Sequence, residues 1–162
     1  MHTHNHKRYV LNLFVFALLS EIPWNLVHDN TLLFPSQNVL FTLTLGLLGL
    51  EALTRWQHDR KRQTLSLLLL FVLSVVMRAD YGCAGFSFIL LLYILRGQPL
   101  LQCIIGSSLL PRRWLTAWTF IPLAMYNGRR GFIQGRWGKY LFYAFYPTHL
   151  LILYLVRLHL MG

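Results

Sequence analysis

The sequence predicts an all-α fold: a polytopic integral membrane helix bundle with about six or seven transmembrane helices in one domain over residues 1–162. Its residues are 56% hydrophobic and only 12% charged, with a mean hydropathy of +0.48. A soluble domain has about a quarter charged residues. The apolar residues also form continuous runs, whereas the strands of a membrane barrel alternate apolar and polar residues. Continuous runs in lipid predict helices, which pair their own backbone groups.

Seven apolar runs are the candidate spans. A straight crossing needs about 20 residues, so several of these runs predict tilting, local thinning of the bilayer or partial insertion. The first run contains Glu21 and Pro23, and the second contains Asn38. The runs cover residues 9–27, 37–54, 64–78, 82–95, 99–110, 114–126 and 139–158.

The last run contains a proline and a histidine, which a plain membrane anchor does not need. Pro147 has no N–H, so the carbonyl of Tyr143 loses its helical partner and the helix is predicted to bend. His149 shares a helix face with Tyr146 and Leu153. An ionisable group at membrane depth usually faces a bundle interior or a wet cavity. His149 therefore has either a functional role or a hydrogen bond to a neighbouring helix, and this run alone does not decide between them.

The positive charges predict the orientation, because Lys and Arg gather in cytoplasmic loops. The N-terminus and alternate loops hold eleven of them: Lys7, Arg8, Arg55, Arg60, Lys61, Arg62, Arg96, Arg129, Arg130, Arg136 and Lys139. The opposite side holds four: Arg78, Arg112, Arg113 and Arg157. This imbalance predicts a cytoplasmic N-terminus and, with seven spans, a C-terminus outside. Arg112 and Arg113 lie on the less basic side, so either these arginines bind lipid phosphate there or runs five and six form one bent or re-entrant element.

The net charge of +10 does not indicate a nucleic-acid partner, because the cations lie in short loops between apolar runs. Cys83 and Cys103 lie inside apolar runs without the spacing of metal ligands, so we interpret both as packing residues. Histidines at every second position near the N-terminus are weak evidence for a metal site, so no metal site is predicted. No cleavable signal peptide is expected, because no small-residue cleavage site closes the first run.

The chain has five acidic residues, and two of them stand out. Asp59 in its basic loop is most simply a charge partner, and Glu51 lies one turn before Arg55, where an ion pair explains it. Asp29 is predicted to lie in a loop. Glu21 and Asp80 both belong to the outer end of the predicted bundle. With His149 they form a candidate proton-handling set, although an ion pair with Arg78 also explains Asp80.

A basic loop precedes the last run. Residues 127–131 read NGRRG, and guanidinium groups bind phosphate bidentately while glycines let backbone N–H groups approach an anion. On chemistry alone, an ordinary positive-inside loop or a contact to anionic lipid explains the same residues.

Five stretches resemble one family, in the family's order and across nearly the whole chain. They read ALLSEIPW at 17–24, NVLFTL at 38–43, ADYG at 79–82, YNGRRG at 126–131 and KYLFYAFYPTHL at 139–150. These stretches look like the TraX family of bacterial inner-membrane proteins linked to conjugative pili. The resemblance implies a multi-pass membrane acetyltransferase that transfers acetyl from acetyl-CoA, as co-substrate, to a pilin N-terminus or another membrane-associated acceptor.

The resemblance also implies roles for individual residues. His149 would act as the base or as an orienting group, with Asp80 and Glu21 positioning it or the acceptor. Asn127, Arg129, Arg130 and Lys139 would bind CoA from the cytoplasm. The residues expected to bind the acceptor are Asn38, Tyr81 and Tyr146.

One departure from the family pattern supports a rival prediction. Family members usually begin with additional helices, the first of which carries an Asp-His pair suited to be the catalytic base. This chain opens MHTHN, which resembles the segment after that hairpin, so we expect a late start or a shortened member. The rival is a non-catalytic accessory protein of conjugative pilus or fimbrial assembly, with polar groups that only hold helices together. A transporter is a weaker third reading, because no inverted repeat is visible.

Overall fold

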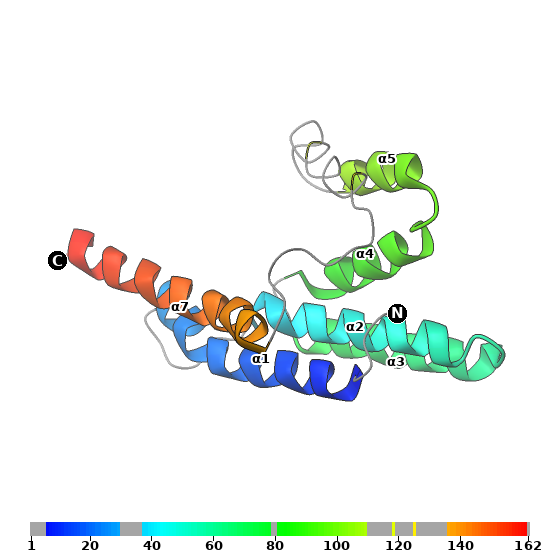
Figure 1. The fold of residues 1–162 in the computed structure, drawn as a ribbon, viewed down its shortest axis with the longest axis horizontal. Coiled ribbons are helices and arrows are strands. Elements are labelled where there is room, and N and C mark those ends of the chain that lie inside the picture. Colours follow the sequence, from blue (N-terminus) through cyan, green and yellow to red (C-terminus); the bar gives the residue numbers. More distant parts are fainter. Residues whose placement is uncertain are drawn as a thin grey trace.

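The structure is a computed structural model that describes residues 6–29, 37–78, 81–109, 118, 125 and 136–161. Within these ranges the chain is all-α and contains no strand, as predicted (Figure 1). The sixth predicted run, 114–126, lies outside the described residues except for Trp118 and Met125. The helices are α1 (His6–Asp29), α2 (Val39–Arg55), α3 (Arg60–Val76), α4 (Gly82–Ile94), α5 (Pro99–Leu109) and α7 (Arg136–Met161).

The helix ends follow from capping residues that flank the apolar runs. Asp59 caps α3 by accepting a hydrogen bond from the backbone N–H of Arg62 at 3.1 Å, and it also pairs with the Arg62 guanidinium at 3.0 Å. The amide of Gln63 donates to the carbonyl of Leu53 at 3.0 Å. These contacts close the α2–α3 turn and confirm Asp59 as a charge partner.

Helices α2 and α4 approach closely because small residues line their contact. At Gly46 of α2, an added Cβ would lie 2.5 Å from the Cδ1 atom of Ile89. At Gly85 of α4, it would lie 2.4 Å from the Cβ of Tyr81 and 2.7 Å from the Cγ2 of Thr42. Small residues that let helix backbones approach are typical of helix contacts in membranes.

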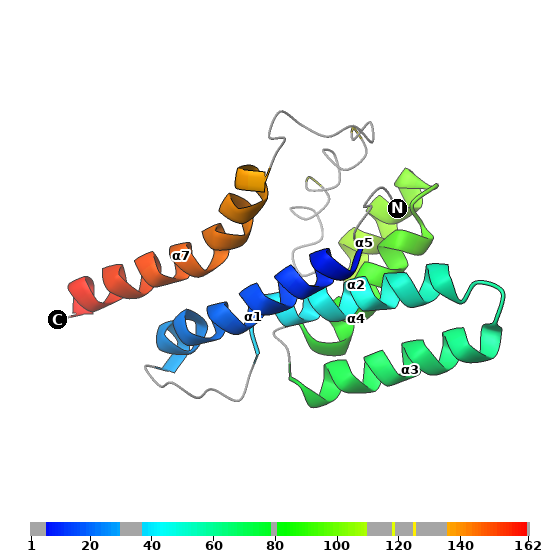
Figure 2. The same cartoon turned by 60° about the horizontal axis from the view of Figure 1, so that its bottom comes forward.

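Helix α7 runs in the same direction as α1, beside which it lies (Figure 2). Near the start of both helices, the rings of Tyr9 and Tyr143 lie 6.2 Å apart. Near the end of both, the guanidinium of Arg157 donates to the carbonyl of Val27. Helix α7 is continuous and curved (Figure 2) and contains Pro147, which accounts for a bend.

The core lies where α1, α2 and α7 meet. Its buried members are Leu13 and Ala17 of α1 with Leu40 and Phe41 of α2. Tyr143 and Tyr146 of α7 pack against this cluster. The contact brings the start of α2, the middle of α1 and the middle of α7 to one place, and this is where the candidate site lies.

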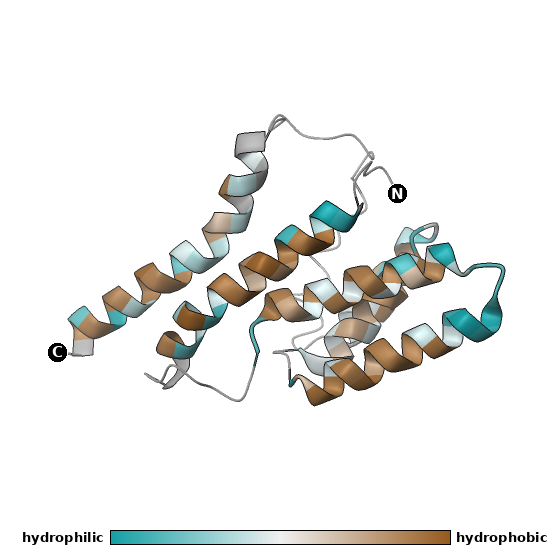
Figure 3. Ribbon diagram, turned by 90° about the horizontal axis from the view of Figure 1, so that it is seen from below, coloured by the Kyte–Doolittle hydropathy of each residue, from teal (hydrophilic) through white to brown (hydrophobic). Residues whose placement is uncertain are grey.

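Outside this core the described helices present much apolar surface. Figure 3 shows hydrophobic residues along the helices and hydrophilic ones at the start of α1 and in the α2–α3 turn. Among the described helices, α1 alone is both long and apolar enough to cross a bilayer, over Lys7–Val27 with a mean hydropathy of 1.6. Helices α4 and α5 contain shorter apolar segments, Gly82–Ile94 and Pro99–Ser108. The multi-pass arrangement therefore stays a prediction.

Candidate functional site

The site is organised by Asn38, which precedes α2 and is completely buried. Its side-chain carbonyl accepts from the backbone N–H of Leu40 at 3.0 Å and so caps α2. Its Nδ2 donates to the backbone carbonyl of Ala17 at 2.8 Å and to Oε2 of Glu21 at 2.7 Å. An asparagine amide offers two donors and a carbonyl acceptor, so one side chain both starts α2 and ties it to α1.

Glu21 is therefore held by one of its two carboxyl oxygens. Its Oε2 accepts from Asn38, while its Oε1 is buried and has no hydrogen-bond partner in the described part of the chain. A second polar atom in the same condition among the described residues is Oγ1 of Thr42, one turn after Asn38 on α2. A buried polar atom without a partner is costly. Of the two carboxyl oxygens of Glu21, Oε1 is therefore the one that no described residue holds.

Helix α7 brings aromatic residues to the same region. The ring of Tyr143 stacks on Phe16 with centroids 5.2 Å apart, and Tyr146 packs on the cluster that contains Ala17. The Ala17 carbonyl is the one that accepts from Asn38. Tyr146 and the Asn38–Glu21 pair thus both adjoin the stretch of α1 that contains Ala17.

His149 lies beside this contact and is half-buried. Its Nδ1 is 3.1 Å from the carbonyl oxygen of Phe145, and its ring centroid is 5.3 Å from that of Tyr146. A carbonyl oxygen only accepts, so this contact places the proton of a neutral imidazole on Nδ1 and leaves Nε2 as the acceptor. A histidine held in this way presents Nε2 as a base.

Two members of the predicted catalytic set, His149 and Glu21, are described, and they do not hydrogen-bond to each other. Leu150 is the most deeply buried residue described on α7, with 6% exposure, so His149 occupies the edge of the α7 contact face. Its predicted face-sharing with Tyr146 is confirmed by their ring contact.

The structure describes only some of the other predicted site residues. Tyr81 precedes α4 with 57% of its surface exposed, and its carbonyl accepts from the backbone N–H of Gly85 at 2.9 Å. Lys139 lies in the first turn of α7. The catalytic candidate Asp80 and the CoA-binding candidates Asn127, Arg129 and Arg130 lie outside the described residues.

Three features of the structure are absent from the sequence predictions. They are the Ala17 carbonyl as an acceptor, the buried hydroxyl of Thr42, and the hydrogen bond from Arg157 to Val27. The spacing of four residues from Ala17 to Glu21, and from Asn38 to Thr42, is the signal that places each pair on one helix face. Among the described residues, no group of three His, Cys, Asp or Glu side chains could hold a metal ion.

Comparison with known proteins gives two matches. Residues 1–157 match the family described as TraX protein. A curated relative, named "Probable fimbrial assembly protein FimC, serogroup H1", from Dichelobacter nodosus, is 28% identical over 182 aligned residues. The alignment covers 94% of this chain and 72% of the relative. No solved structure matches the chain.

Proposed function

The chain belongs to the TraX family, and from that premise we propose that it is a multi-pass membrane acetyltransferase that acts in pilus or fimbria assembly. The assembly role is supported by the family and by the relative's name as a probable fimbrial assembly protein. The proposed donor is acetyl-CoA, and the proposed acceptor is a pilin N-terminus or another membrane-associated group.

Two features support the proposed membrane location in the bacterial inner membrane. The outward faces of α3, α5 and α7 are apolar, with Val76, Leu100 and Leu141 each at least 66% exposed. Such surface is costly in water and favourable in lipid. Helices α1 and α7 run in the same direction, which fits the odd number of crossings proposed, with the N-terminus in the cytoplasm and the C-terminus outside.

The observation that carries the proposed chemistry is the arrangement of His149. Nδ1 is bound to the Phe145 carbonyl, so Nε2 is available to take a proton. In the proposed step the acceptor amine attacks the acetyl carbonyl carbon and forms the C–N bond, His149 takes the amine proton, and the C–S bond breaks. The proton then passes to the departing thiolate, which leaves as CoA thiol.

The remaining residues have supporting roles in this proposal. Glu21, oriented by Asn38, positions the acceptor through its free Oε1, and Asp80, Tyr81 and Tyr146 complete the acceptor side. On the cytoplasmic side Asn127, Arg129, Arg130 and Lys139 bind the CoA phosphates. If acetyl-CoA binding is unchanged in the variant R129A/R130A, this assignment of the loop is wrong.

The test is transfer of radiolabel from acetyl-CoA in membranes that contain the chain and native membrane extract. We expect wild type to label an acceptor and His149→Ala to abolish labelling. The matched control is Leu153→Ala, which truncates a half-exposed residue one turn further along α7 and should retain transfer. Thermal unfolding of each variant in detergent establishes that it is folded.

A second candidate function is a non-catalytic accessory protein of pilus or fimbrial assembly. The observation that favours it is the missing hydrogen bond between His149 and Glu21, although both side chains are described. This candidate predicts no labelling by folded wild type, and a loss of stability rather than of transfer in His149→Ala.

A further inference from the structure

A groove of about 410 Å³ lies between α1 and α2, away from the Asn38–Glu21 pair. It is lined by two facing stripes: Lys7, Val10, Leu11 and Phe14 of α1, and Thr44, Leu48 and Glu51 of α2. The helices are antiparallel, so Lys7 and Glu51 lie at the same end of the groove. Apart from Thr44, the rest of the lining is apolar. The Thr44 hydroxyl donates to the Leu40 carbonyl at 2.7 Å, which removes the donor that this wall would otherwise offer.

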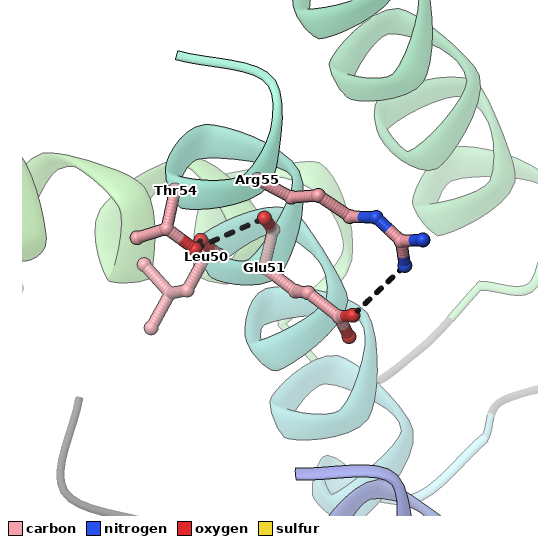
Figure 4. A network of polar contacts seen from close by, with 4 residues as sticks. All are labelled: Leu50, Glu51, Thr54 and Arg55. Atoms are coloured by element: carbon pink, nitrogen blue, oxygen red, sulfur yellow. Dashed lines mark hydrogen bonds and ion pairs between the residues drawn. The ribbon is translucent and has the colours of Figure 1, made fainter.

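Positive charges outnumber negative charges at the mouth of the groove. Glu51 pairs with Arg55 at 3.6 Å, as predicted from the sequence (Figure 4). Lys7 has no ion pair in the part of the chain that the structure describes. Arg8 follows it and is exposed. The mouth therefore carries more positive than negative charge, and a bound group with a negative charge would complement it.

The adjoining α2–α3 turn adds cations and an aromatic anchor. The guanidinium groups of Arg55 and Arg62 lie over the ring of Trp56, at 5.5 Å and 5.1 Å from its centroid. Hydrophilic residues gather at this turn and at the start of α1 (Figure 3). Tryptophan and basic residues at one end of an apolar bundle are typical of the boundary between membrane and water.

We propose that this groove binds a membrane phospholipid with an anionic headgroup. One acyl chain lies along Leu11, Phe14 and Leu48, and the phosphate is bound by Lys7 with Arg55 beside it. The apolar stretch from Lys7 to Phe14 is about 10 Å long, which accommodates part of a chain. Leu11 and Phe14 are 59% and 40% exposed, so the groove opens sideways, toward lipid, rather than only at its end.

The proposal rests on the membrane location proposed above and is independent of acetyl transfer. The experiment is native mass spectrometry of the full chain in neutral detergent, titrated with dioleoyl phosphatidylglycerol or with dioleoyl phosphatidylcholine. We expect one tightly bound phosphatidylglycerol per chain and weaker phosphatidylcholine binding. Lys7→Gln should weaken phosphatidylglycerol binding about tenfold, because it removes a charge-assisted contact.

Two further variants separate the groove from general surface charge. Leu11→Trp adds bulk from the exposed side of the groove, leaves the charge unchanged and should also weaken binding. Arg96→Gln removes a cation that lies over the Tyr93 ring near the end of α4 and is not part of the groove lining, so this variant should bind like wild type. Circular dichroism melting establishes that each variant is folded.

Three results would overturn the proposal. One is equal phosphatidylglycerol affinity in wild type, Lys7→Gln and Leu11→Trp. Another is an equal loss in Arg96→Gln, which would show attraction to surface charge alone. The third is displacement of the lipid by equimolar acetyl-CoA, which would assign the groove to the acyl donor. Lipid binding is read without acetyl transfer, so an inactive protein that binds phosphatidylglycerol supports this inference while contradicting the proposed enzyme.

Discussion

The side-chain amide of Asn38 donates to the carboxylate of Glu21 at 2.7 Å while its carbonyl caps α2. One buried residue therefore fixes both the start of a helix and the orientation of an acidic group on its neighbour. Its amide groups are all bonded within the protein, which favours a positioning role for Asn38 over direct contact with an acceptor.

Two substitutions of Asn38 should distinguish the stability that comes from capping α2 from the stability that comes from its hydrogen bonds to α1. Asn38→Ala loses both and leaves the Glu21 carboxylate buried, so we expect the free energy of unfolding to fall by about 1–3 kcal/mol. Asn38→Ser restores a capping oxygen but not the amide donors, so its loss should be smaller. Thermal unfolding in detergent measures both. Equal stability of wild type and Asn38→Ala would contradict this account of the contact.

Glu21→Gln tests the acidic group without removing the contact. Glutamine keeps a side-chain oxygen that accepts from Asn38, so we expect stability within about 1 kcal/mol of wild type. If Glu21 handles a proton or positions the acceptor amine in the proposed reaction, acetyl transfer should fall about 100-fold. Radiolabel transfer and thermal unfolding are measured on the same preparation. Unchanged transfer in the folded variant would remove Glu21 from the site.

The loss of stability when a glycine is replaced by alanine should depend on how easily the neighbouring atoms can move away. In Gly85→Ala the new methyl meets the Cβ of Tyr81 at 2.4 Å and, across the contact with α2, the Cγ2 of Thr42 at 2.7 Å. The Tyr81 Cβ is fixed to the backbone and the Thr42 side chain is branched at Cβ, so we expect a loss of about 1–3 kcal/mol. Gly46→Ala meets the Cδ1 end of Ile89, which can rotate away, so its loss should be smaller. Gly97→Ala, with nothing within 4 Å, is the neutral control. The same loss at all three positions would contradict the close approach of α2 and α4.

The sequence predicts the helices of this fold better than their contacts. The ends of the described helices lie within four residues of the corresponding apolar runs, because those runs and the caps Asn38 and Asp59 are local signals. Pro23 and Pro147 are both inside helices, because a proline bends a helix without always ending it.

The rotation of each helix about its axis could not be predicted, and that rotation determines which side chains meet in the candidate site. Asn38 reaches Glu21 across 17 positions, and Arg157 reaches Val27 across 130. A run that is apolar on every side carries little information about which face meets which neighbour. The central histidine of the last run therefore suggested a buried group, whereas Leu150 is the buried residue and His149 lies at the edge.

The contact between Arg157 and Val27 predicts a measurable coupling between the ends of α1 and α7. The Val27 carbonyl is among the last four of α1, which have no partner within the helix, and a cation there also complements the helix dipole. Arg157→Met should remove both effects, cost about 1 kcal/mol, and increase hydrogen exchange in the last turns of both helices. Arg157→Lys keeps the charge and should exchange more slowly than Arg157→Met. If exchange in the last turn of α1 is the same in wild type and Arg157→Met, α7 does not hold this end of α1, and its parallel alignment then depends on contacts further from the helix ends, such as those of Tyr143 and Tyr146.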